Sequence, residues 1–267
     1  MEETISTGHA VILGFLQGLT EFLPVSSSAH LIVASAFMDG KPLPLTLNIA
    51  LHIGTFGAVM LYFWRDWIRI AAACVKRLGG ERSFESDTLL PALVIGSIPA
   101  GVVGILWNDI IEEKFHHPLT VVAPLALVGI LLWWIDKSRT ATKKLNGLTI
   151  FDGFLIGLGQ ACALIPGVSR SGATIITGRL RGLGREDAAR FSFMLGTPAM
   201  FGAALLKRHE LIASAGDPVF IYGTLTSLIS GCLTIAVFLK FLRRFGFGIF
   251  AVYRVALAAT ILVIVLR

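Results

Sequence analysis

The residues with the clearest chemical potential stand in one stretch, Pro166-Gly-Val-Ser-Arg-Ser-Gly-Ala-Thr174, inside an otherwise apolar region. Arg170 is central, because a guanidinium at membrane depth is costly unless something pairs with it. Its planar fork suits a carboxylate or a phosphate. Ser169, Ser171 and Thr174 add hydroxyl groups, and the two glycines let backbone N–H groups approach an oxyanion. We interpret the stretch as a phosphate-binding site; the alternative is a solvated cytoplasmic turn.

Gln17 and Glu21 form a second group of polar residues within an apolar segment. They are four residues apart, so a helix places both on one face. Glu21 needs a partner there, and Arg170 suits it as a counter-ion. A divalent cation such as Mg²⁺ or Ca²⁺ suits it too, because these cations prefer carboxylate, amide and phosphate oxygens. Both partners stay open, as does a solvated Glu21 at the membrane interface.

Three serines, Ser26, Ser27 and Ser28, follow Pro24 at a break in the helical pattern. Serine is a favoured N-cap, so at least one of them should cap the next helix. We assign Ser27 to the cavity, as a nucleophile or a hydrogen-bond donor. His30 lies three residues later and can act as a general acid or base near neutral pH, or as a structural hydrogen-bonding residue.

Other polar residues carry weaker expectations. Asp152 should stabilise the start of a helix rather than take part in catalysis. Asn48 and His52 share one helical face and are expected to line the cavity. His116 and His117 are expected to be ordinary surface residues.

The composition assigns the chain to the polytopic helical membrane proteins. Of 267 residues, 55% are hydrophobic and only 15% are charged, more apolar than a soluble domain requires. The net charge of +6 fits basic cytoplasmic loops, so no nucleic-acid partner is expected. The three cysteines have no metal-ligand spacing and are interpreted as packing residues.

Two broken segments, at residues 8–38 and 150–180, are each split by a proline and a polar elbow. Their halves are too short to cross a membrane, which takes about 20 helical residues. We therefore predict two re-entrant helix-elbow-helix hairpins surrounded by protein or water. Six full spans are expected, at about 45–64, 89–108, 119–136, 187–206, 218–240 and 247–266. The fold class is all-α integral membrane, in a single membrane domain of residues 1–267.

The two hairpins resemble each other in sequence. A shift of 143 positions without a gap gives five identities in fifteen positions: Gly14 with Gly157, Gln17 with Gln160, Val25 with Val168, Ser26 with Ser169 and Ser28 with Ser171. Each half, 1–136 and 150–267, holds one hairpin and three spans. An odd number of crossings turns the second half over, so we predict an inverted repeat with its site near the membrane midplane.

Orientation follows from the basic residues. Fifteen lysines and arginines fall on the side opposite the N-terminus and five on the same side. The side with fifteen should face the cytoplasm, which places both termini outside.

The motifs together resemble a known family. Gln17-Gly-Leu-Thr-Glu21, then Phe-Leu-Pro-Val-Ser-Ser at 22–27 with His30, and the stretch 166–174 are similar to those of the undecaprenyl-diphosphate phosphatases, the integral-membrane bacitracin-resistance family. The similarity covers essentially the whole chain, including its length and the order of its segments.

The resemblance implies an activity and a site. The family removes the terminal phosphate of undecaprenyl diphosphate, a phosphoanhydride hydrolysis that returns the lipid carrier of peptidoglycan synthesis, and it needs a divalent metal. The implied metal-binding motif is Gln17 with Glu21. The implied catalytic residues include Arg170 and His30, and the hydroxyl residues of the second motif are Ser169, Ser171 and Thr174. From the residues themselves, Ser26 and Gln17 also join the expected substrate-binding set.

The resemblance also implies a bacterial cytoplasmic membrane location with the active site open to the periplasm or the cell exterior. The expected partners are a polyprenyl diphosphate lipid and the bilayer, and a homodimer stays open. Two departures stand out: Gln17 replaces a glutamate found in many members, and Ala29 replaces a common glycine.

A transporter is the rival function. Inverted repeats with broken helices are typical of secondary carriers, and a glutamate, a histidine and an arginine at the midplane suit proton-coupled movement of a lipid phosphate or a small anion. A purely structural membrane partner would leave these buried charges unexplained.

Overall fold

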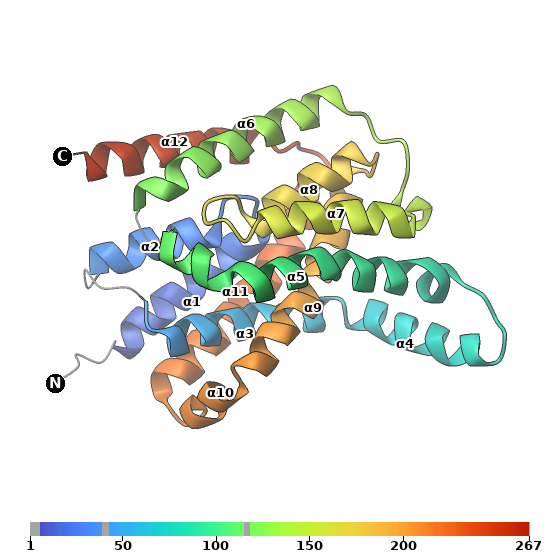
Figure 1. Ribbon diagram of the computed structural model, residues 1–267, viewed down its shortest axis with the longest axis horizontal. Helices are drawn as coiled ribbons and strands as arrows, with labels where there is room; N and C mark the ends of the chain where they lie inside the picture. The colour runs from blue at the N-terminus through green and yellow to red at the C-terminus, as the bar shows by residue number, and fades with distance from the viewer. Residues whose placement is uncertain (1–5, 39–42, 115–117, 267) are drawn as a thin grey trace.

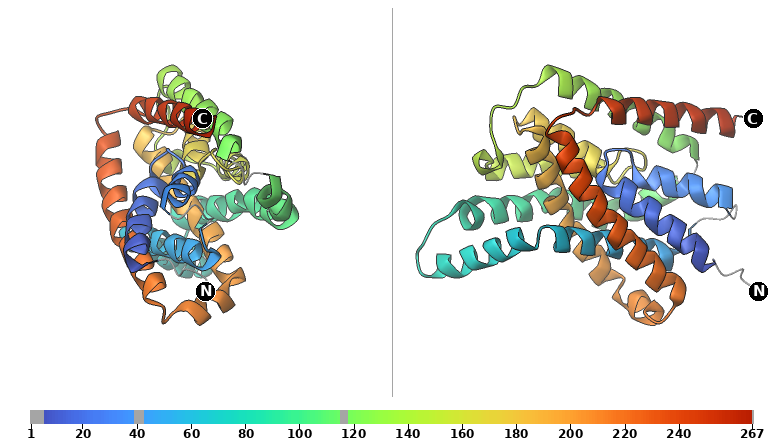
Figure 2. Two further views of the ribbon diagram at one scale, coloured as in Figure 1. Left: turned by 90° about the vertical axis from the view of Figure 1, so that its left-hand side faces the viewer. Right: turned by 180° about the vertical axis from the view of Figure 1, so that it is seen from behind.

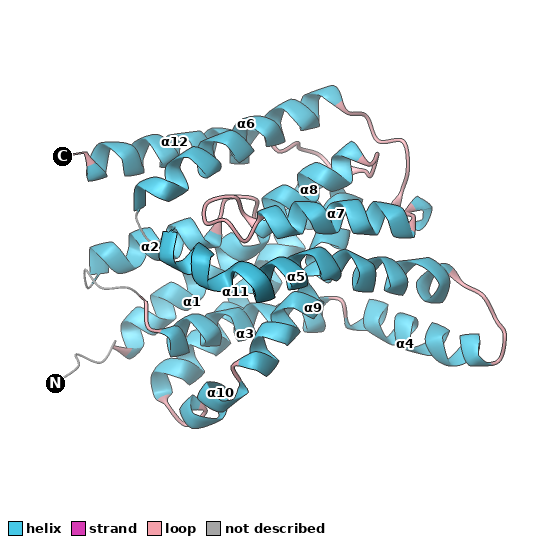
Figure 3. Ribbon diagram, in the orientation of Figure 1, coloured by secondary structure: helices cyan, strands magenta, loops and turns pink. Residues whose placement is uncertain are grey.

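The computed structural model describes residues 6–38, 43–114 and 118–266; His116 and His117 lie outside these ranges. The described chain is helical, with no strand in these ranges, and most helices run along one direction (Figures 1 and 3). The helices are α1 (Thr7–Phe22), α2 (Ser27–Met38), α3 (Leu45–Tyr62), α4 (Trp64–Leu78), α5 (Leu90–Lys114), α6 (Val122–Ser138), α7 (Ile150–Cys162), α8 (Arg170–Leu180), α9 (Arg185–Leu206), α10 (Arg208–Ser214), α11 (Pro218–Leu242) and α12 (Gly248–Val265). Three short turns are η1 (Glu85–Leu89), η2 (Pro118–Val121) and η3 (Leu145–Gly147).

Six segments are long and apolar enough to cross a membrane. They are Leu45–Tyr62, Glu85–Trp107, Leu119–Ser138, Arg185–Leu206, Pro218–Leu242 and Gly248–Val265. Each overlaps one predicted span, so the prediction of six transmembrane helices is confirmed. The chain is a multi-pass membrane protein, and the start of α1 and the end of α12 lie at the same end of the molecule (Figures 1 and 2).

Helix α4 was not predicted: the sequence analysis placed no helix between the spans at about 45–64 and 89–108. It is amphipathic: Trp64, Ile68 and Val75 are exposed large apolar side chains spaced along one side, and the basic residues Arg69 and Lys76 directly follow two of them. Because α4 contains many charged residues, its mean hydropathy is low, and only the spacing of its apolar residues indicates a helix. The helix extends α3 at the end of the molecule remote from the start of α1 (Figure 1).

Both predicted hairpins form helix-elbow-helix units. Helices α1 and α2 are joined by the first elbow (residues 23–26), and α7 and α8 by the second elbow (residues 163–169). Ser26 and Ser169, equivalent under the 143-residue shift, both have a φ of 73°. Left-handed backbone is uncommon outside glycine, so the elbows share one unusual turn geometry. We expect both hairpins to re-enter the membrane, as the sequence predicts.

Asp152 has the structural role expected of it. The Thr149 hydroxyl accepts a hydrogen bond from the Asp152 N–H, while the Asp152 carboxylate accepts one from the Thr149 N–H, which completes a capping box at the start of α7. The same carboxylate pairs with Lys143 Nζ at 2.6 Å and with Arg181 Nε at 2.7 Å. These contacts therefore fix the second hairpin at the end remote from its elbow, where α7 begins and α8 ends.

Glycines bring each hairpin into backbone contact with a full span. Helix α1 packs on α11, and α7 packs on α5. A Cβ on Gly14 would lie 2.7 Å from the Gly223 carbonyl oxygen, and a Cβ on Gly153 would lie 2.6 Å from the Ala92 oxygen. At Gly157, the equivalent of Gly14, a Cβ would collide with the backbone of Gly96. Close approach through small residues is the usual way that membrane helices associate.

Candidate active site

The two elbows, where each hairpin turns, meet in the interior of the molecule. Arg170 Nη2 lies 3.2 Å from Glu21 Oε1, and these side chains are 15% and 7% exposed. The hydroxyl of Ser171 donates across the same junction to the Leu23 carbonyl at 3.0 Å. Of the partners that the sequence left open for Glu21, the structure thus shows Arg170 from the second hairpin.

The other carboxylate oxygen of Glu21, Oε2, accepts two further hydrogen bonds. Ser27 Oγ donates to Glu21 Oε2 at 2.7 Å, and Gln17 Nε2 donates to the same oxygen at 3.1 Å. We call Gln17, Glu21, Ser27 and Arg170 the polar cluster. A carboxylate in this position orients the serine hydroxyl and can accept its proton.

Helix α9 fixes the position of Arg170. Arg170 Nη1 donates to the Ser192 carbonyl at 3.0 Å, and the Ser192 hydroxyl lies 2.6 Å from Thr174 Oγ1. Thr174 Oγ1 also donates to the Arg170 carbonyl at 2.7 Å, so this threonine supports its own helix. Gly196 leaves room for the guanidinium, since a Cβ there would lie 2.5 Å from Arg170 Cζ.

One N–H donor of Arg170, its Nε–H, is buried without a hydrogen-bond partner among the described residues. A buried donor of this kind is costly unless a ligand completes it. A phosphoryl oxygen is the natural acceptor for a guanidinium that already holds a carboxylate and a carbonyl.

The cluster fits a divalent cation. Gln17 Oε1 is buried without a partner among the described residues, beside the Glu21 carboxylate, and both are oxygen ligands that Mg²⁺ and Ca²⁺ accept. His52, predicted to line the cavity, has Nδ1 3.1 Å from Gln17 Nε2, while Asn48 is half-buried one turn earlier. Within the described ranges, no group of three His, Cys, Asp or Glu side chains gathers, so phosphate oxygens and water would complete the coordination.

His30 lies apart from the polar cluster in its hydrogen bonding. Its Nδ1 is 2.7 Å from the Ser26 carbonyl, and its Nε2 is 2.6 Å from the Tyr253 hydroxyl. Because a carbonyl can only accept, Nδ1 carries a proton, and in the neutral ring Nε2 accepts from Tyr253. The two rings also stack, with centroids 5.6 Å apart.

The remaining predicted residues are buried within the hairpins. Ser26 Oγ lies 3.2 Å from Ser28 Oγ, and Ser169 Oγ lies 3.2 Å from Ser171 Oγ, the same contact in both elbows. Ser169 also caps α8 by accepting from the Gly172 N–H. These hydroxyls shape the elbows around the cluster. Gln160 is buried, and its amide atoms have no partner in the described part of the chain.

Several residues that contact the site residues were not predicted from the sequence. Arg254 and Tyr253 lie in α12, and Ser192 and Gly196 lie in α9. An arginine in the middle of an apolar span was a visible signal, since such residues usually face the interior of the bundle. Nothing in the sequence marks Ser192 or Gly196, whose contacts depend on how α9 crosses α8.

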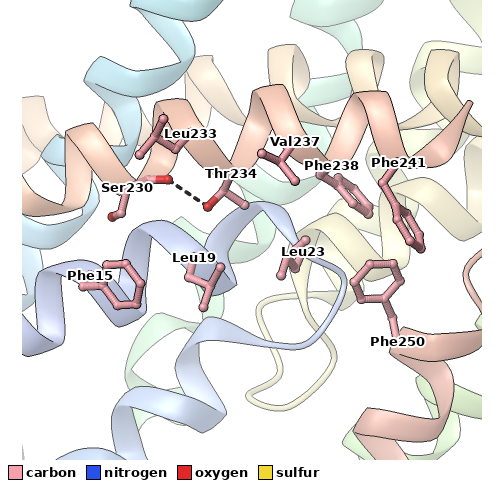
Figure 4. A pocket seen from close by; sticks show the side chains of 10 residues that line it. All are labelled: Phe15, Leu19, Leu23, Ser230, Leu233, Thr234, Val237, Phe238, Phe241 and Phe250. Carbon is pink, nitrogen blue, oxygen red and sulfur yellow. Dashed lines mark hydrogen bonds between the residues drawn. The ribbon is translucent and has the colours of Figure 1, made fainter.

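An apolar groove lies between α1, α11 and α12, and Figure 4 shows the side chains that line one part of it. It has two adjoining segments of about 350 and 330 Å³, and both include Leu19, Leu23, Phe241 and Phe250. The first segment, which we call the α11 segment, is further lined by Phe15, Ser230, Leu233, Thr234, Val237 and Phe238. The second, which we call the α12 segment, is further lined by Leu16, Thr20, Val25, His30, Ile249 and Tyr253. The Thr234 hydroxyl donates to the Ser230 carbonyl at 2.8 Å, so the wall of the α11 segment presents few free polar groups.

Comparison with known proteins gives a consistent result. Residues 10–260 match the model of the family described as Bacitracin resistance protein BacA. The undecaprenyl-diphosphatase of Moorella thermoacetica is 43% identical over 256 residues, which cover 96% of this chain and 97% of that protein. The undecaprenyl-diphosphatases of Thermomicrobium roseum and Desulforudis audaxviator are 44% and 41% identical, with 96% and 97% of this chain and 97% of each relative covered. The chain belongs to the bacitracin resistance protein BacA family.

Proposed function

We propose that this protein hydrolyses undecaprenyl diphosphate to undecaprenyl phosphate and inorganic phosphate, which returns the lipid carrier to cell-wall synthesis. The polar cluster carries the proposal, because it joins a serine hydroxyl, a carboxylate and a guanidinium at the meeting point of two hairpins inside a membrane protein. The relatives named undecaprenyl-diphosphatase support the same activity. The transport alternative is not favoured.

In the mechanism that we propose, Ser27 is the nucleophile. Its Oγ attacks the terminal phosphorus, its proton passes to Glu21 Oε2, and the bond from that phosphorus to the bridging oxygen breaks, so undecaprenyl phosphate leaves. Water then hydrolyses the phosphoserine and releases phosphate. Arg170 stabilises the charge on the transferred phosphoryl group, with its Nε–H as the donor that has no partner among the described residues.

Gln17 and Glu21 would hold a divalent metal in this site, and such an ion would neutralise charge on the diphosphate. Their oxygens lie on one face of α1, with Gln17 Oε1 unpaired within the described structure. We expect EDTA to abolish phosphate release by the purified protein and Mg²⁺ to restore it. Undiminished release after exhaustive chelation would exclude the metal.

Replacing Ser27 with alanine tests the nucleophile. We expect phosphate release from undecaprenyl diphosphate in detergent to fall at least about a hundredfold, because both the attacking oxygen and its hydrogen bond to Glu21 disappear. Acid quenching of the wild type should trap phosphate on Ser27, detectable by peptide mass spectrometry.

Ser28→Ala is the matched control, since Ser28 is exposed and bonds only to its neighbour Ser26 among the contacts that the structure shows. It should keep near wild-type rates. An Ser27→Ala protein that released phosphate at the wild-type rate would leave direct attack by water as the mechanism. A wild-type protein that released no phosphate in detergent would instead support transport.

We place the polyprenyl tail in the apolar groove. The α12 segment includes Thr20 and Val25, which are close to Glu21 and Ser27 in the chain, although no residue of the polar cluster lines it. The α11 segment is apolar and lies between the transmembrane helix α11 and α1, where it can open to the hydrocarbon core (Figure 4). We infer that the tail lies in this groove while the diphosphate passes the first elbow to reach the cluster.

A tryptophan at position 237 tests the groove. Val237 lines it and is 67% exposed, so Val237→Trp should fill it and raise KM for undecaprenyl diphosphate about tenfold, an effect of ~1.4 kcal/mol. KM for a short-chain prenyl diphosphate should change little. Val252→Trp is the control, because Val252 is 70% exposed on α12 and lines neither segment. Equal effects of both variants would remove the tail from this groove.

We also infer the orientation of the chain. The end bearing fifteen basic residues faces the cytoplasm and both termini face outward, as the charge asymmetry favours. The charge count does not decide which side the site opens to; we place its mouth on the outer side because the resemblance to the phosphatase family implies it. A fluorescent reporter that folds only in the cytoplasm, fused to the outward-facing C-terminus, should therefore give no fluorescence.

A further inference from the structure

Arg254 is a fully buried arginine in the middle of α12. Its guanidinium donates to four backbone carbonyls. Nε reaches Leu125 at 3.0 Å, Nη1 reaches Pro24 at 3.0 Å, and Nη2 reaches both Gly167 and Val168, at 2.8 and 3.1 Å. One side chain thus bonds to α6, to the first elbow and to the second elbow.

These carbonyls need a partner. Pro24, Gly167 and Val168 lie where a half-helix has ended, so their oxygens cannot be satisfied by the helical pattern. They are also buried, and unpaired carbonyls in a membrane interior are strongly unfavourable. A guanidinium can satisfy all of them because its donors form a rigid planar fork, whereas a lysine ammonium reaches fewer acceptors at once.

The charge of Arg254 is held by carbonyls rather than by an acid. Among the described residues, no carboxylate lies within 4.0 Å of it in an ion pair, in contrast to Arg170 with Glu21. The dipoles of the two elbows are therefore its main compensation. A buried cation retained at this cost indicates a specific task.

The neighbouring residue acts on the same elbow. Tyr253 donates to His30 Nε2, and His30 Nδ1 donates to the Ser26 carbonyl. Adjacent positions of α12 thus reach the first elbow at Pro24 directly and at Ser26 through a histidine. In this arrangement His30 supports the backbone directly before Ser27.

We propose that Arg254 is a positioning residue that holds the two elbows at the spacing required by the polar cluster. Glu21 and Ser27 flank the first elbow, and Arg170 directly follows the second. A guanidinium bonded to both elbows fixes the distance between the nucleophile and the group that binds the phosphoryl oxygens. The catalytic part of this proposal depends on the proposed phosphatase function, and the structural part does not.

The test combines kinetics with thiol labelling of the full-length protein. Cys74, Cys162 and Cys232 are replaced by alanine, and a single cysteine is placed at Val25 or at Val168, buried positions in the two elbows. Arg254→Met is then added to each background. We expect N-ethylmaleimide to label both cysteines several-fold faster than it does when Arg254 is present.

In the native-cysteine protein, Arg254→Met should lower kcat for phosphate release about a hundredfold while KM changes little, since a misplacement of about 1 Å costs roughly that factor. Arg254→Lys should be intermediate in labelling and in kcat. Monodisperse elution in detergent confirms that each variant is folded.

Arg179→Met is the matched control. Arg179 is 4% exposed, lies at the end of α8 opposite the second elbow, pairs with Asp136 at 4.0 Å and donates to the carbonyls of Leu183 and Arg139, so none of its contacts is to an elbow. It should leave kcat and both labelling rates near their starting values. Labelling unchanged at both elbows, a rise at one elbow only, or the same loss of kcat in Arg179→Met would overturn the proposal. A wild type that releases no phosphate, together with faster labelling in Arg254→Met, would instead reject the phosphatase function and support the structural role of Arg254 in holding the two elbows.

Discussion

Arg170→Lys should lower kcat for phosphate release about a thousandfold, equivalent to ~4 kcal/mol of transition-state stabilisation. Lysine keeps the positive charge but loses the fork that contacts Glu21 Oε1 and the Ser192 carbonyl at once. It also loses the free Nε donor that we assign to a phosphoryl oxygen. Stopped-time assays of released phosphate in detergent measure the effect.

The control for this variant is Arg181→Lys. Arg181 follows α8 and pairs with Asp152 outside the polar cluster, where lysine can replace it. Its kcat should stay within about twofold of wild type, as expected for a partly exposed ion pair. If Arg170→Lys retained a tenth or more of the activity, charge alone would be sufficient and the planar fork would have no catalytic role.

Gly196→Ala should lower kcat about a hundredfold even though residue 196 touches no substrate. The new methyl group would lie 2.5 Å from Arg170 Cζ and closer still to Nη1, so the guanidinium must leave its place. A displacement of about 1 Å in a catalytic group is enough for a loss of this size. The kcat of purified Gly196→Ala, measured beside its thermal unfolding, gives the answer.

Gly202→Ala provides the comparison on the same helix. A Cβ at Gly202 would meet no atom within 4 Å, so this alanine should keep full activity and slightly raise helix stability. Full activity of Gly196→Ala would show that Arg170 functions from another position than the one described here.

The sequence predicted the spans because long apolar runs have few structural alternatives. The helical limits of all six predicted spans agree with the structure within a few residues. It also predicted the approach of Glu21 to Arg170, because two buried charges of opposite sign in an apolar chain stabilise each other. Helix α4 was missed since its charges resemble a loop, and only its spacing reveals a helix.

Other contacts depend on helix crossings that no local pattern specifies. Ser192 and Gly196 matter because α9 passes beside Arg170, and Tyr253 matters because α12 passes beside His30. The sequence placed His30 with the polar cluster on proximity along the chain. In the structure its two nitrogens face the Ser26 carbonyl and Tyr253, so its hydrogen bonds support the elbow.

The glycine contacts of α1 with α11 and of α7 with α5 have a consequence for turnover. Both hairpins are pressed backbone to backbone against full spans, at positions where even one methyl group would collide. Sliding either hairpin would break this fit, so we expect the catalytic framework to remain stationary through the reaction cycle. Exchange of lipid would then take place through the groove: the long chain enters and leaves laterally through the bilayer, while the water that hydrolyses the phosphoserine and the released phosphate exchange with the aqueous phase.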